Sequence, residues 1–169
     1  LTASVSASVI ATTDPAAAAN GADFQDGNII SDSVFYDGNA MSSTAIQSFF
    51  NTKTCWINNG NPTYAAGAYI PQLNTYVAND CLKGYVQNTV NMSGRNSAGQ
   101  IVCSDYTGAS QESAATIIAR VGQACGISQK VLLVLLEKEQ SLISDPWPSV
   151  VQYNSATGFA CYDNNQPCT

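Results

Sequence analysis

The stretch SQESAATIIARVGQACGISQKVLLVLLEKEQSLI, residues 110–143, carries the strongest structural signal in the chain. Its first half has the i, i+3, i+4, i+7 spacing of one helix face, set by Ala114, Ile117, Ile118 and Val121. Ser110 is placed to cap this helix, Glu112 falls in its first turn, and Gly126 is placed to end it. The pattern therefore predicts a helix from Ser110 to the residue before Gly126.

The second half predicts another helix over 129–143, capped by Ser128 and ended by Asp145-Pro146. At about 3.6 residues per turn, Glu139 lies at the centre of its apolar face, within about 60° of five aliphatic residues. Those five are Leu132, Leu135, Leu136, Leu142 and Ile143. A carboxylate at that position is unusual and invites a chemical explanation.

Glu139 can be interpreted in two ways. A carboxylate on an apolar face is costly to ionise, and a carboxyl group that keeps its proton near neutral pH is what a general acid supplies. The alternative is a helix-end glutamate that turns to solvent or pairs with Lys138 or Arg120. Glu137 points the opposite way and is expected to be a solvated surface residue. Periodicity alone does not choose between a catalytic and a structural Glu139.

Outside these two helices the sequence predicts less regular structure. Ser42 or Ser43 caps an amphipathic helix, and a further helix is expected over 70–79. Residues 54–108 hold most of the Asn, Gly and Pro and are otherwise expected to be mainly loop. The tail, 147–169, is expected to be aromatic and polar loop.

These elements predict a mainly α fold with long loops pinned by disulfides, with an α+β fold as the alternative. The chain has 169 residues, which suits one domain. Residues 1–23 are rich in Ala, Ser and Thr and are expected to form a flexible N-terminus of the mature protein. The expected single domain, held by disulfides, covers 24–169.

Six cysteines form the second strong signal, and none of them falls in a Cys-x-x-Cys pair. The chain has no histidine, so the common Cys/His zinc sites are excluded and no metal site is expected. Three disulfides in an oxidising compartment are the simplest interpretation, against the alternative of six buried thiols. Of about 15 possible pairings, we predict the nearest neighbours in sequence, namely Cys55–Cys81, Cys103–Cys125 and Cys161–Cys168.

The charge and the missing residue types narrow the function classes. A net charge of −6 and a pI of about 4.2 argue against a nucleic-acid partner, which needs a basic surface. No apolar run reaches the roughly 18 residues of a membrane span. Without histidine there is no Ser-His-Asp or Cys-His nucleophile, and neither a phosphate-binding Gly loop nor a calcium loop is evident. No cofactor is expected, and carboxylate chemistry or pure binding remains.

Three segments carry a wider resemblance: GNIISDSVFYDGNAMSSTAIQSFFNTK, ESAATIIARVGQACGISQKVLLVLLEKEQSLISDPWPS and QYNSATGFACYD. They resemble a family of secreted actinobacterial proteins placed loosely among cell-wall hydrolases, over most of residues 24–163. The run GISQKVLLVLLEKEQSLI is also similar to the catalytic helix of lysozyme-like muramidases and soluble lytic transglycosylases. There an apolar helix ends in Glu-Ser, whereas this chain has an inserted Gln140 before Ser141. The resemblance implies a lysozyme-like helical core.

The same resemblance implies that Glu139 protonates the glycosidic oxygen between MurNAc and GlcNAc. In a lytic transglycosylase the MurNAc 6-hydroxyl then attacks intramolecularly, with the same carboxylate as base. A hydrolase would need a second carboxylate about 5–9.5 Å away, for which Asp145 and Asp163 are the candidates. Members of the family extend beyond the position of Cys168, so the domain is expected to continue past Thr169. The residues expected to bind glycan follow the helix and are Trp147, Gln152, Tyr153, Asn154 and Phe159.

The leading hypothesis is a secreted, cell-wall-associated glycosidase or lytic transglycosylase with Glu139 as its acid and base. The rival is a non-catalytic secreted protein that binds cell-wall glycan or a partner, with a structural Glu139. An assembly subunit is a third hypothesis, because a low-charge surface also suits self-association. The enzyme requires Glu139 on the wall of an open groove lined by Trp147 or Tyr153, whereas a sealed or freely solvated Glu139 favours the binder.

Overall fold

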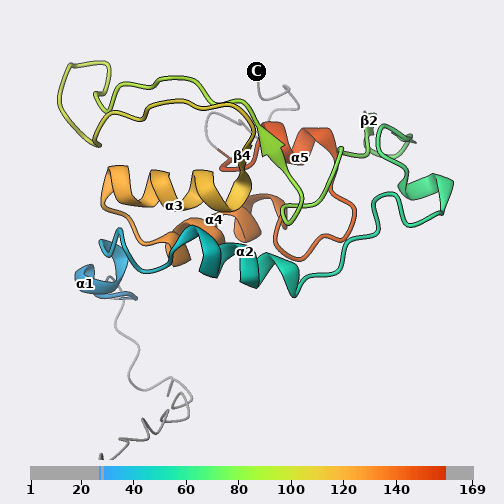
Figure 1. The fold of residues 1–169 in the computed structure, drawn as a ribbon, viewed down its shortest axis with the longest axis horizontal. Helices are drawn as coiled ribbons and strands as arrows, with labels where there is room; N and C mark the ends of the chain where they lie inside the picture. Colours follow the sequence, from blue (N-terminus) through green and yellow to red (C-terminus); the bar gives the residue numbers. More distant parts are fainter. Residues whose placement is uncertain (1–26, 28, 159–169) are drawn as a thin grey trace, which may run out of the picture. The chain divides into compact units, whose positions relative to one another are not determined.

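The computed structural model describes Gly27 and residues 29–158. The chain divides into two compact units, Leu1–Ser31 and Asp32–Thr169, and every helix and strand described below lies in the second (Figure 1). In chain order these elements are α1 (Asp32–Phe35), α2 (Ser43–Asn51), a 3₁₀ turn (Pro62–Tyr64), β1 (Tyr69–Ile70), β2 (Thr75–Tyr76), β3 (Val86–Gln87), β4 (Glu112–Ser113), α3 (Ala114–Cys125), α4 (Gln129–Gln140) and α5 (Val150–Asn154).

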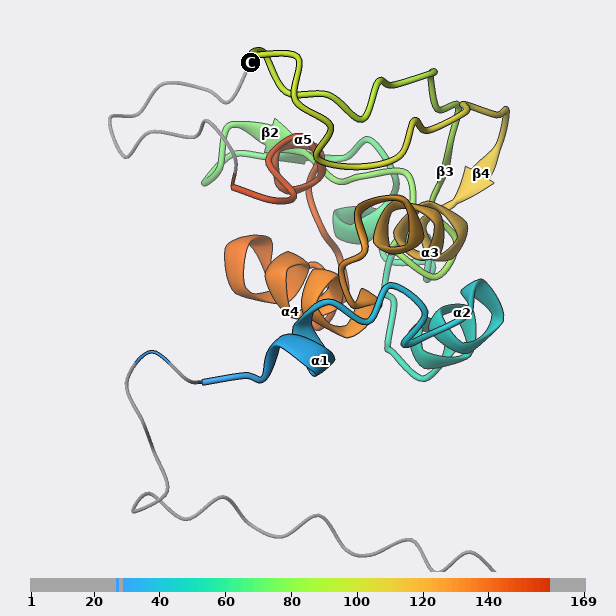
Figure 2. The same ribbon diagram turned by 90° about the vertical axis from the view of Figure 1, so that its left-hand side faces the viewer.

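Three helices build the hydrophobic core of the second unit. α3 packs against both α2 and α4, and Figure 2 shows it lying above the other two. Its buried face is made largely of alanine, so the neighbouring helices approach closely and larger side chains from α2 fill the space. The buried core residues are Ile46, Phe50, Leu82, Ala114, Ala115, Ile118, Ala119, Leu133 and Leu142.

The helix predicted after Ser42 is confirmed. The Ser42 hydroxyl accepts a hydrogen bond from the Ala45 amide at 3.2 Å, which caps α2 at its N-terminus. Ile46 and Phe50 lie one turn apart on its inner face and are almost fully buried. Local propensity, capping and burial agree in this segment, which explains why the sequence is sufficient to predict it.

The helix predicted from Ser110 exists but begins later. Ser113, not Ser110, is its N-cap, and Glu112 lies in β4 rather than in the first helical turn. Gln111 has a φ of 52°, which interrupts a helical path, and β3 supplies backbone partners for β4. The predicted stop is confirmed, because Gly126 adopts a φ of 64° at the C-terminus of α3.

The helix predicted over 129–143 is also shorter than expected. α4 ends at Gln140 because Ser141 takes a left-handed φ of 54°, and the Ser141 amide donates to the Glu137 carbonyl at 2.8 Å. This is the single hydrogen bond of an αL ending, which usually has glycine at the left-handed position. Asp145-Pro146 therefore lies well beyond the helix end and does not cause it. Leu142 instead enters the core from the turn.

The helix predicted over 70–79 is wrong, because this segment forms an antiparallel hairpin. Tyr69 pairs with Tyr76 and Ile70 pairs with Thr75. Ile70 and Thr75 are buried on one face while the two tyrosines are exposed on the other, which is the two-residue period of a strand. Asn74 adopts a φ of 47° in the connecting turn, a conformation that asparagine tolerates better than most residues.

The segment after α4 also departs from the expected loop, since it contains the short helix α5. Its start is a capping box, in which the Ser149 hydroxyl accepts from the Gln152 amide and the Gln152 side chain accepts from the Ser149 amide. In the described residues the fold is thus a small mixture of helices and two short antiparallel sheets, rather than a mainly α fold.

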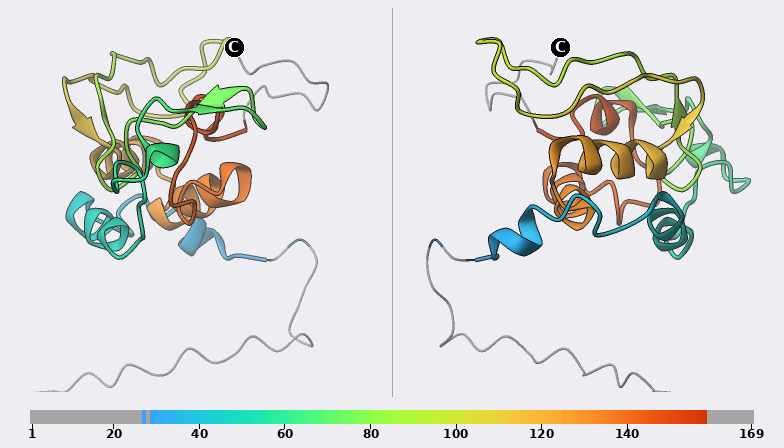
Figure 3. Two further views of the ribbon diagram at one scale, coloured as in Figure 1. Left: turned by 90° about the vertical axis from the view of Figure 1, so that its right-hand side faces the viewer. Right: turned by 60° about the vertical axis from the view of Figure 1, so that its left-hand side comes forward.

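A long ribbon, residues 86–113, runs out and back over α3 (Figures 1 and 3). Its two arms pair at β3–β4 and at two isolated bridges further out. Cys103 on the returning arm is bonded to Cys125 at the end of α3, and the neighbouring Ser104 amide donates to the Ala124 carbonyl at 2.7 Å. The returning arm is therefore joined to the C-terminal end of α3 by the disulfide, and it continues through β4 directly into the N-terminal end of α3.

Two of the three predicted disulfides are confirmed. The structure contains Cys55–Cys81 and Cys103–Cys125, while Cys161 and Cys168 lie outside the described residues. The two bonds join cysteines 26 and 22 residues apart in sequence, and closing loops of this length removes conformational entropy from the unfolded chain. Two disulfides indicate that the chain matures in an oxidising compartment.

Gln129, at the start of α4, is the most deeply buried polar side chain of the core helices. Its amide nitrogen donates to the carbonyls of Gly38 and Ala119 at 2.5 and 3.2 Å. Its amide oxygen accepts from the Met41 amide at 3.0 Å. One side chain therefore links α4 to α3 and to the chain segment before α2.

The Gln129 contacts predict a specific loss of stability. Gln129→Leu keeps most of the volume but removes the side-chain partner of the Met41 amide and of the Gly38 and Ala119 carbonyls, so we expect a loss of about 3 kcal/mol in the free energy of unfolding. The matched control, Gln123→Leu on the exposed side of α3, should change it by less than about 0.5 kcal/mol. Urea unfolding followed by circular dichroism measures both, and equal effects would contradict the role of Gln129.

Candidate functional site

Glu139 lies in the last turn of α4 and is paired with its neighbour. Its side chain is 28% exposed, and its carboxylate accepts a hydrogen bond from the Lys138 ammonium at 2.7 Å. This hydrogen bond and the negative charge of Glu139 raise the pKa of Lys138. Lys138 itself is 75% exposed, and an ion pair so open to water holds its partners only weakly. The glutamate is thus neither sealed in the core nor freely solvated.

The buried face of α4 is not centred on Glu139, contrary to the helical-wheel prediction. The buried residues of the helix are Gln129 and Leu133. At about 3.6 residues per turn they lie about 80° and 120° around the helix from Glu139. Gln129 was not among the five aliphatic residues used to centre the wheel, although its amide enters the core. Glu139 therefore lies at the margin of the buried face.

Glu137 is not the solvated residue that the sequence predicted. Its carboxylate accepts hydrogen bonds from the Ile143 amide at 3.1 Å, from the Ser144 amide at 3.0 Å and from the Ser144 hydroxyl at 2.7 Å. These hydrogen bonds stabilise the turn that follows α4. Glu137 thereby has a structural role, and Glu139 is the carboxylate of this helix that remains open.

The backbone of Gly158 approaches Glu139 closely. A Cβ added to Gly158 would overlap a carboxylate oxygen of Glu139, and Gly158 also has a φ of 64°. Glycine is the residue that combines this φ with such an approach at no steric cost. The segment after α5 therefore forms one side of the surroundings of Glu139.

An apolar hollow of about 230 Å³ lies beside this end of α4. Leu136, one turn before Glu139, contributes to its wall, and so do Tyr153 and Ala156 from α5 and the segment after it. Glu139 is not itself among the lining residues, so the described residues do not place it on the wall of the groove that the enzyme hypothesis requires. The other residues around the hollow are Leu82, Tyr85, Gln87, Ala114, Ile117, Ile118 and Leu142.

Of the three aromatic residues expected to bind glycan, the two in the described part of the chain lie at different places. Tyr153 faces the hollow and stacks on Tyr85 with ring centroids 4.4 Å apart. Its hydroxyl donates to the Asp80 carbonyl at 3.0 Å, and burial strongly raises the pKa of its phenol. Trp147 instead packs edge-on against Tyr64 at 5.1 Å. Only Tyr153 therefore shares the hollow beside Glu139.

Two of the polar side chains considered for the site, those of Gln152 and Asp145, already form hydrogen bonds within the fold. Besides its capping bonds, Gln152 donates to the Gln140 carbonyl at 2.9 Å and to the Asp145 carboxylate at 2.8 Å. Asp145 also accepts from the Trp147 amide at 3.0 Å, so this candidate second carboxylate already serves the backbone. Asn154 is exposed at the end of α5. Phe159 and Asp163 lie outside the described residues.

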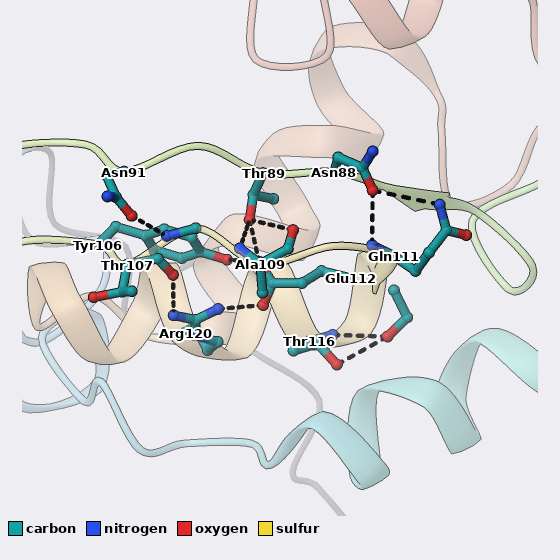
Figure 4. A network of polar contacts seen from close by, with 12 residues as sticks. Asn88, Thr89, Asn91, Tyr106, Thr107, Ala109, Gln111, Glu112, Thr116 and Arg120 are labelled. Atoms are coloured by element: carbon teal, nitrogen blue, oxygen red, sulfur yellow. Dashed lines mark hydrogen bonds and ion pairs between the residues drawn. The ribbon is translucent and has the colours of Figure 1, made fainter.

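A buried acid network was missed by sequence analysis. Glu112 is only 6% exposed and receives hydrogen bonds from the hydroxyls of Thr89 and Tyr106. Arg120 forms an ion pair with it and lies over the Tyr106 ring, 4.2 Å from the centroid (Figure 4). The Arg120 guanidinium also donates to the Thr107 carbonyl of the ribbon. The network joins α3 to both arms of the ribbon.

The ionisation states of this network follow from its contacts. The hydrogen bond from Thr89 is the main cause that holds the pKa of Glu112 below its ordinary value. Arg120 and Tyr106 lower it further against the opposing effect of burial. Burial raises the pKa of the Tyr106 phenol, and the nearby Glu112 raises it further. A carboxylate whose oxygens are all engaged in this way is structural rather than catalytic.

One cluster in the described residues has the spacing of a metal site. Atoms of Cys55, Asp80 and Cys81 lie within 4.8 Å of one another. The two sulfurs are bonded to each other in a disulfide, so neither is a thiolate ligand. The cluster therefore offers a metal ion only the Asp80 carboxylate, which accepts from the Cys81 amide at 2.7 Å.

Comparisons with known proteins do not assign a family. No protein-family model, curated protein or solved structure matches the chain. Among the described helices, none is by itself long and apolar enough to cross a membrane; α3 and α4 meet these criteria only as a pair, and they are bent by 119°.

The Glu112 network predicts an asymmetric pair of variants. Arg120→Met leaves a buried charge with one partner fewer and should lower the free energy of unfolding by about 3 kcal/mol at neutral pH. Glu112→Gln should lower the free energy of unfolding by a smaller amount, because the Arg120 side chain is 34% exposed and water can hydrate its charge. The control Lys130→Met, on the exposed side of α4, should be nearly neutral. A larger cost for Glu112→Gln than for Arg120→Met, measured by urea unfolding, would contradict this account.

The lowered pKa of Glu112 also predicts an acid dependence of stability. A carboxyl group with a depressed folded-state pKa stabilises the fold above its ordinary value of 4.5, and this contribution is lost as the pH falls through the folded-state pKa. Between neutral pH and strongly acidic pH, Glu112→Gln should therefore lose less stability than the unmodified chain. Thermal unfolding across this pH range tests it, and parallel curves for the two proteins would refute it.

Proposed function

We propose that this chain is a secreted, cell-wall-associated enzyme that cleaves MurNAc–GlcNAc linkages in peptidoglycan with Glu139 as acid and base. The supporting observation is that Glu139 is the half-buried carboxylate of the described residues with no structural role. Its partner is the exposed ammonium of the preceding residue, and no backbone amide of residues 29–158 donates a hydrogen bond to it. A group kept at a half-buried position without structural use is a candidate for chemistry.

The other carboxylates in the described part of the chain support this choice by contrast. Glu112 is sealed in its network, and Asp32 is exposed in α1. The remaining ones accept hydrogen bonds from backbone amides, and these are Asp37, Asp80, Asp105, Glu137 and Asp145. By elimination, Glu139 has the best combination of partial burial and availability.

The proposed reaction uses one carboxyl group twice. Glycan binding displaces the Lys138 ammonium, and the Glu139 carboxylate takes up a proton from solvent. Glu139 then donates this proton to the glycosidic oxygen as the bond from C1 of MurNAc breaks. The carboxylate next removes the proton of the MurNAc 6-hydroxyl, whose oxygen bonds to C1 and gives a 1,6-anhydro product. We favour this lytic transglycosylase route because Asp145 already binds Gln152 and a backbone amide. In this proposal α4 corresponds to the catalytic helix of a lysozyme-like core.

A non-catalytic glycan-binding protein is the second candidate, and one observation favours it. The ion pair between Lys138 and Glu139 is the arrangement that a purely structural Glu139 would adopt. In that case, a neutral residue at position 139 would leave glycan binding intact and change stability only slightly.

A single substitution separates the two candidates. Glu139→Gln keeps the shape but removes the proton donor, so we expect at least about a 10²-fold loss of turnover on purified peptidoglycan. The matched control, Glu137→Gln on the same helix, retains an acceptor oxygen for its backbone contacts and should keep activity. Chromatography of the released muropeptides with mass detection of the 1,6-anhydro product measures both. Equal turnover by wild type and Glu139→Gln, or none by wild type, would remove the enzyme proposal.

The close approach of Gly158 provides an independent prediction. In Gly158→Ala the added methyl group would overlap the Glu139 carboxylate and would occupy an unfavourable φ. We expect the carboxylate to be displaced and turnover to fall about tenfold or more while the fold is retained. The control Gly99→Ala also has a positive φ, of 78°, but nothing lies near its added methyl group. If Gly99→Ala lost as much turnover as Gly158→Ala, displacement of Glu139 would not be the cause.

A further inference from the structure

Residues 54–79, which we call the aromatic lobe, contain no Asp, Glu, Lys or Arg. The lobe includes the hairpin β1–β2 and the 3₁₀ turn, and it forms one end of the second unit (Figures 1 and 3). Its aromatic residues are Trp56, Tyr64, Tyr69 and Tyr76, and its amide side chains are Asn58, Asn59, Asn61, Gln72, Asn74 and Asn79. Aromatic rings and amides without charge are thus concentrated in one segment.

Two tyrosine rings stand together on the outer face of the hairpin. Tyr69 and Tyr76 are directly paired across the strands, and their ring centroids lie 5.3 Å apart. The two tyrosines are 52% and 53% exposed, so neither ring belongs to the buried core. The Tyr69 hydroxyl donates to the Asn74 side-chain oxygen at 2.8 Å, which fixes one ring against the turn.

A second aromatic row begins in the same lobe. The Trp56 ring lies 5.3 Å from the Tyr64 ring, which in turn lies 5.1 Å from Trp147. Trp56 is 40% exposed at the outer end of this row, so its ring is supported from behind and open in front. The lobe therefore displays three exposed rings that other parts of the fold hold in place.

A disulfide and backbone hydrogen bonds hold the segments that carry these rings. Cys55, beside Trp56, is bonded to Cys81. Val77, beside Tyr76, forms a bridge with Ser149, and the next amide, of Ala78, donates to the Pro148 carbonyl at 2.9 Å. Rings held in this way lose little conformational entropy when a ligand binds, which favours recognition.

The chemistry of the lobe selects a class of ligand. An uncharged surface gives no electrostatic attraction to nucleic acid, to acidic peptides or to anionic lipid. Aromatic faces pack against apolar C–H surfaces, while amide side chains donate to and accept from hydroxyl groups. Neutral sugars present both kinds of group, C–H faces and hydroxyls, in the same ring. A glycan therefore matches the lobe better than a charged polymer does.

We propose that the aromatic lobe is a glycan-binding site for neutral, N-acetylated sugar chains, in which Tyr69, Tyr76 and Trp56 stack on sugar rings. With the proposed function it shares the N-acetylated sugar ring, since the GlcNAc rings of peptidoglycan are uncharged, but it uses none of the residues around Glu139. It consequently holds for an enzyme, in which it retains the substrate chain by its GlcNAc rings, and for a non-catalytic binder alike.

The experiment measures binding in the Glu139→Gln background, so that cleavage does not interfere. Chitohexaose, a neutral N-acetylated oligosaccharide, is titrated by calorimetry, and purified peptidoglycan is used in sedimentation. Tyr69→Ala/Tyr76→Ala should raise the dissociation constant for chitohexaose about tenfold or more. The matched control is Tyr36→Ala, which removes a ring that is 62% exposed outside the lobe and should leave binding unchanged. Circular dichroism checks that each variant is folded.

A second measurement needs no variant of the lobe. Tetranitromethane nitrates exposed tyrosines, and bound chitohexaose should protect Tyr69 and Tyr76 but not Tyr36 in peptide mass maps. The proposal is overturned if the oligosaccharide does not bind, or if binding is unaffected by the double substitution with all three tyrosines equally nitrated. Loss of peptidoglycan turnover in Glu139→Gln with retained chitohexaose binding supports both proposals. Retained binding without any turnover by wild type leaves the lobe proposal standing and removes the enzyme.

Discussion

The burial of the Gln129 side chain is the constraint on which the position of Glu139 depends. Because its amide must reach Gly38, Met41 and Ala119, α4 is rotated so that Gln129 faces α3. A helix is rigid, so this rotation sets the direction of every later residue. Glu139, roughly a quarter-turn away on the helix circumference, is carried to the edge of the buried face rather than to its centre. A polar contact at the first turn thus decides the exposure of a carboxylate at the last turn.

This dependence explains which parts of the fold could be predicted from the sequence. The existence of α2, α3 and α4 and the stop at Gly126 follow from apolar periodicity and capping, which are local properties. The hairpin at 69–76 and the end of α4 at Ser141 do not, because tertiary pairing and a left-handed serine override weak local signals. The wheel around Glu139 failed for a related reason, because it ranked side chains by polarity while the core accepted a fully hydrogen-bonded glutamine.

The candidate site was predictable in part. The sequence singled out Glu139, placed it at a helix end and named Lys138 as its alternative partner, and the structure contains that pair. It could not show that Gln152 and Asp145 bind each other, since their contact depends on the turn between α4 and α5. Glu112 was missed because its partners, Thr89 and Tyr106, come from the ribbon, whose path is set by the Cys103–Cys125 bond and not by any sequence period.

The scarcity of charge links these features. Only 11% of the residues are charged, and most of the carboxylates in the described part of the chain accept hydrogen bonds from backbone amides or pair with Arg120. Such carboxylates cannot change protonation without loss of stability, which makes them poor acid catalysts. Glu139 differs because its weak pair with an exposed lysine can open at small cost. The aromatic lobe that we propose as a glycan site has no charged residues, so it would not compete with the Glu139 carboxylate for the Lys138 ammonium.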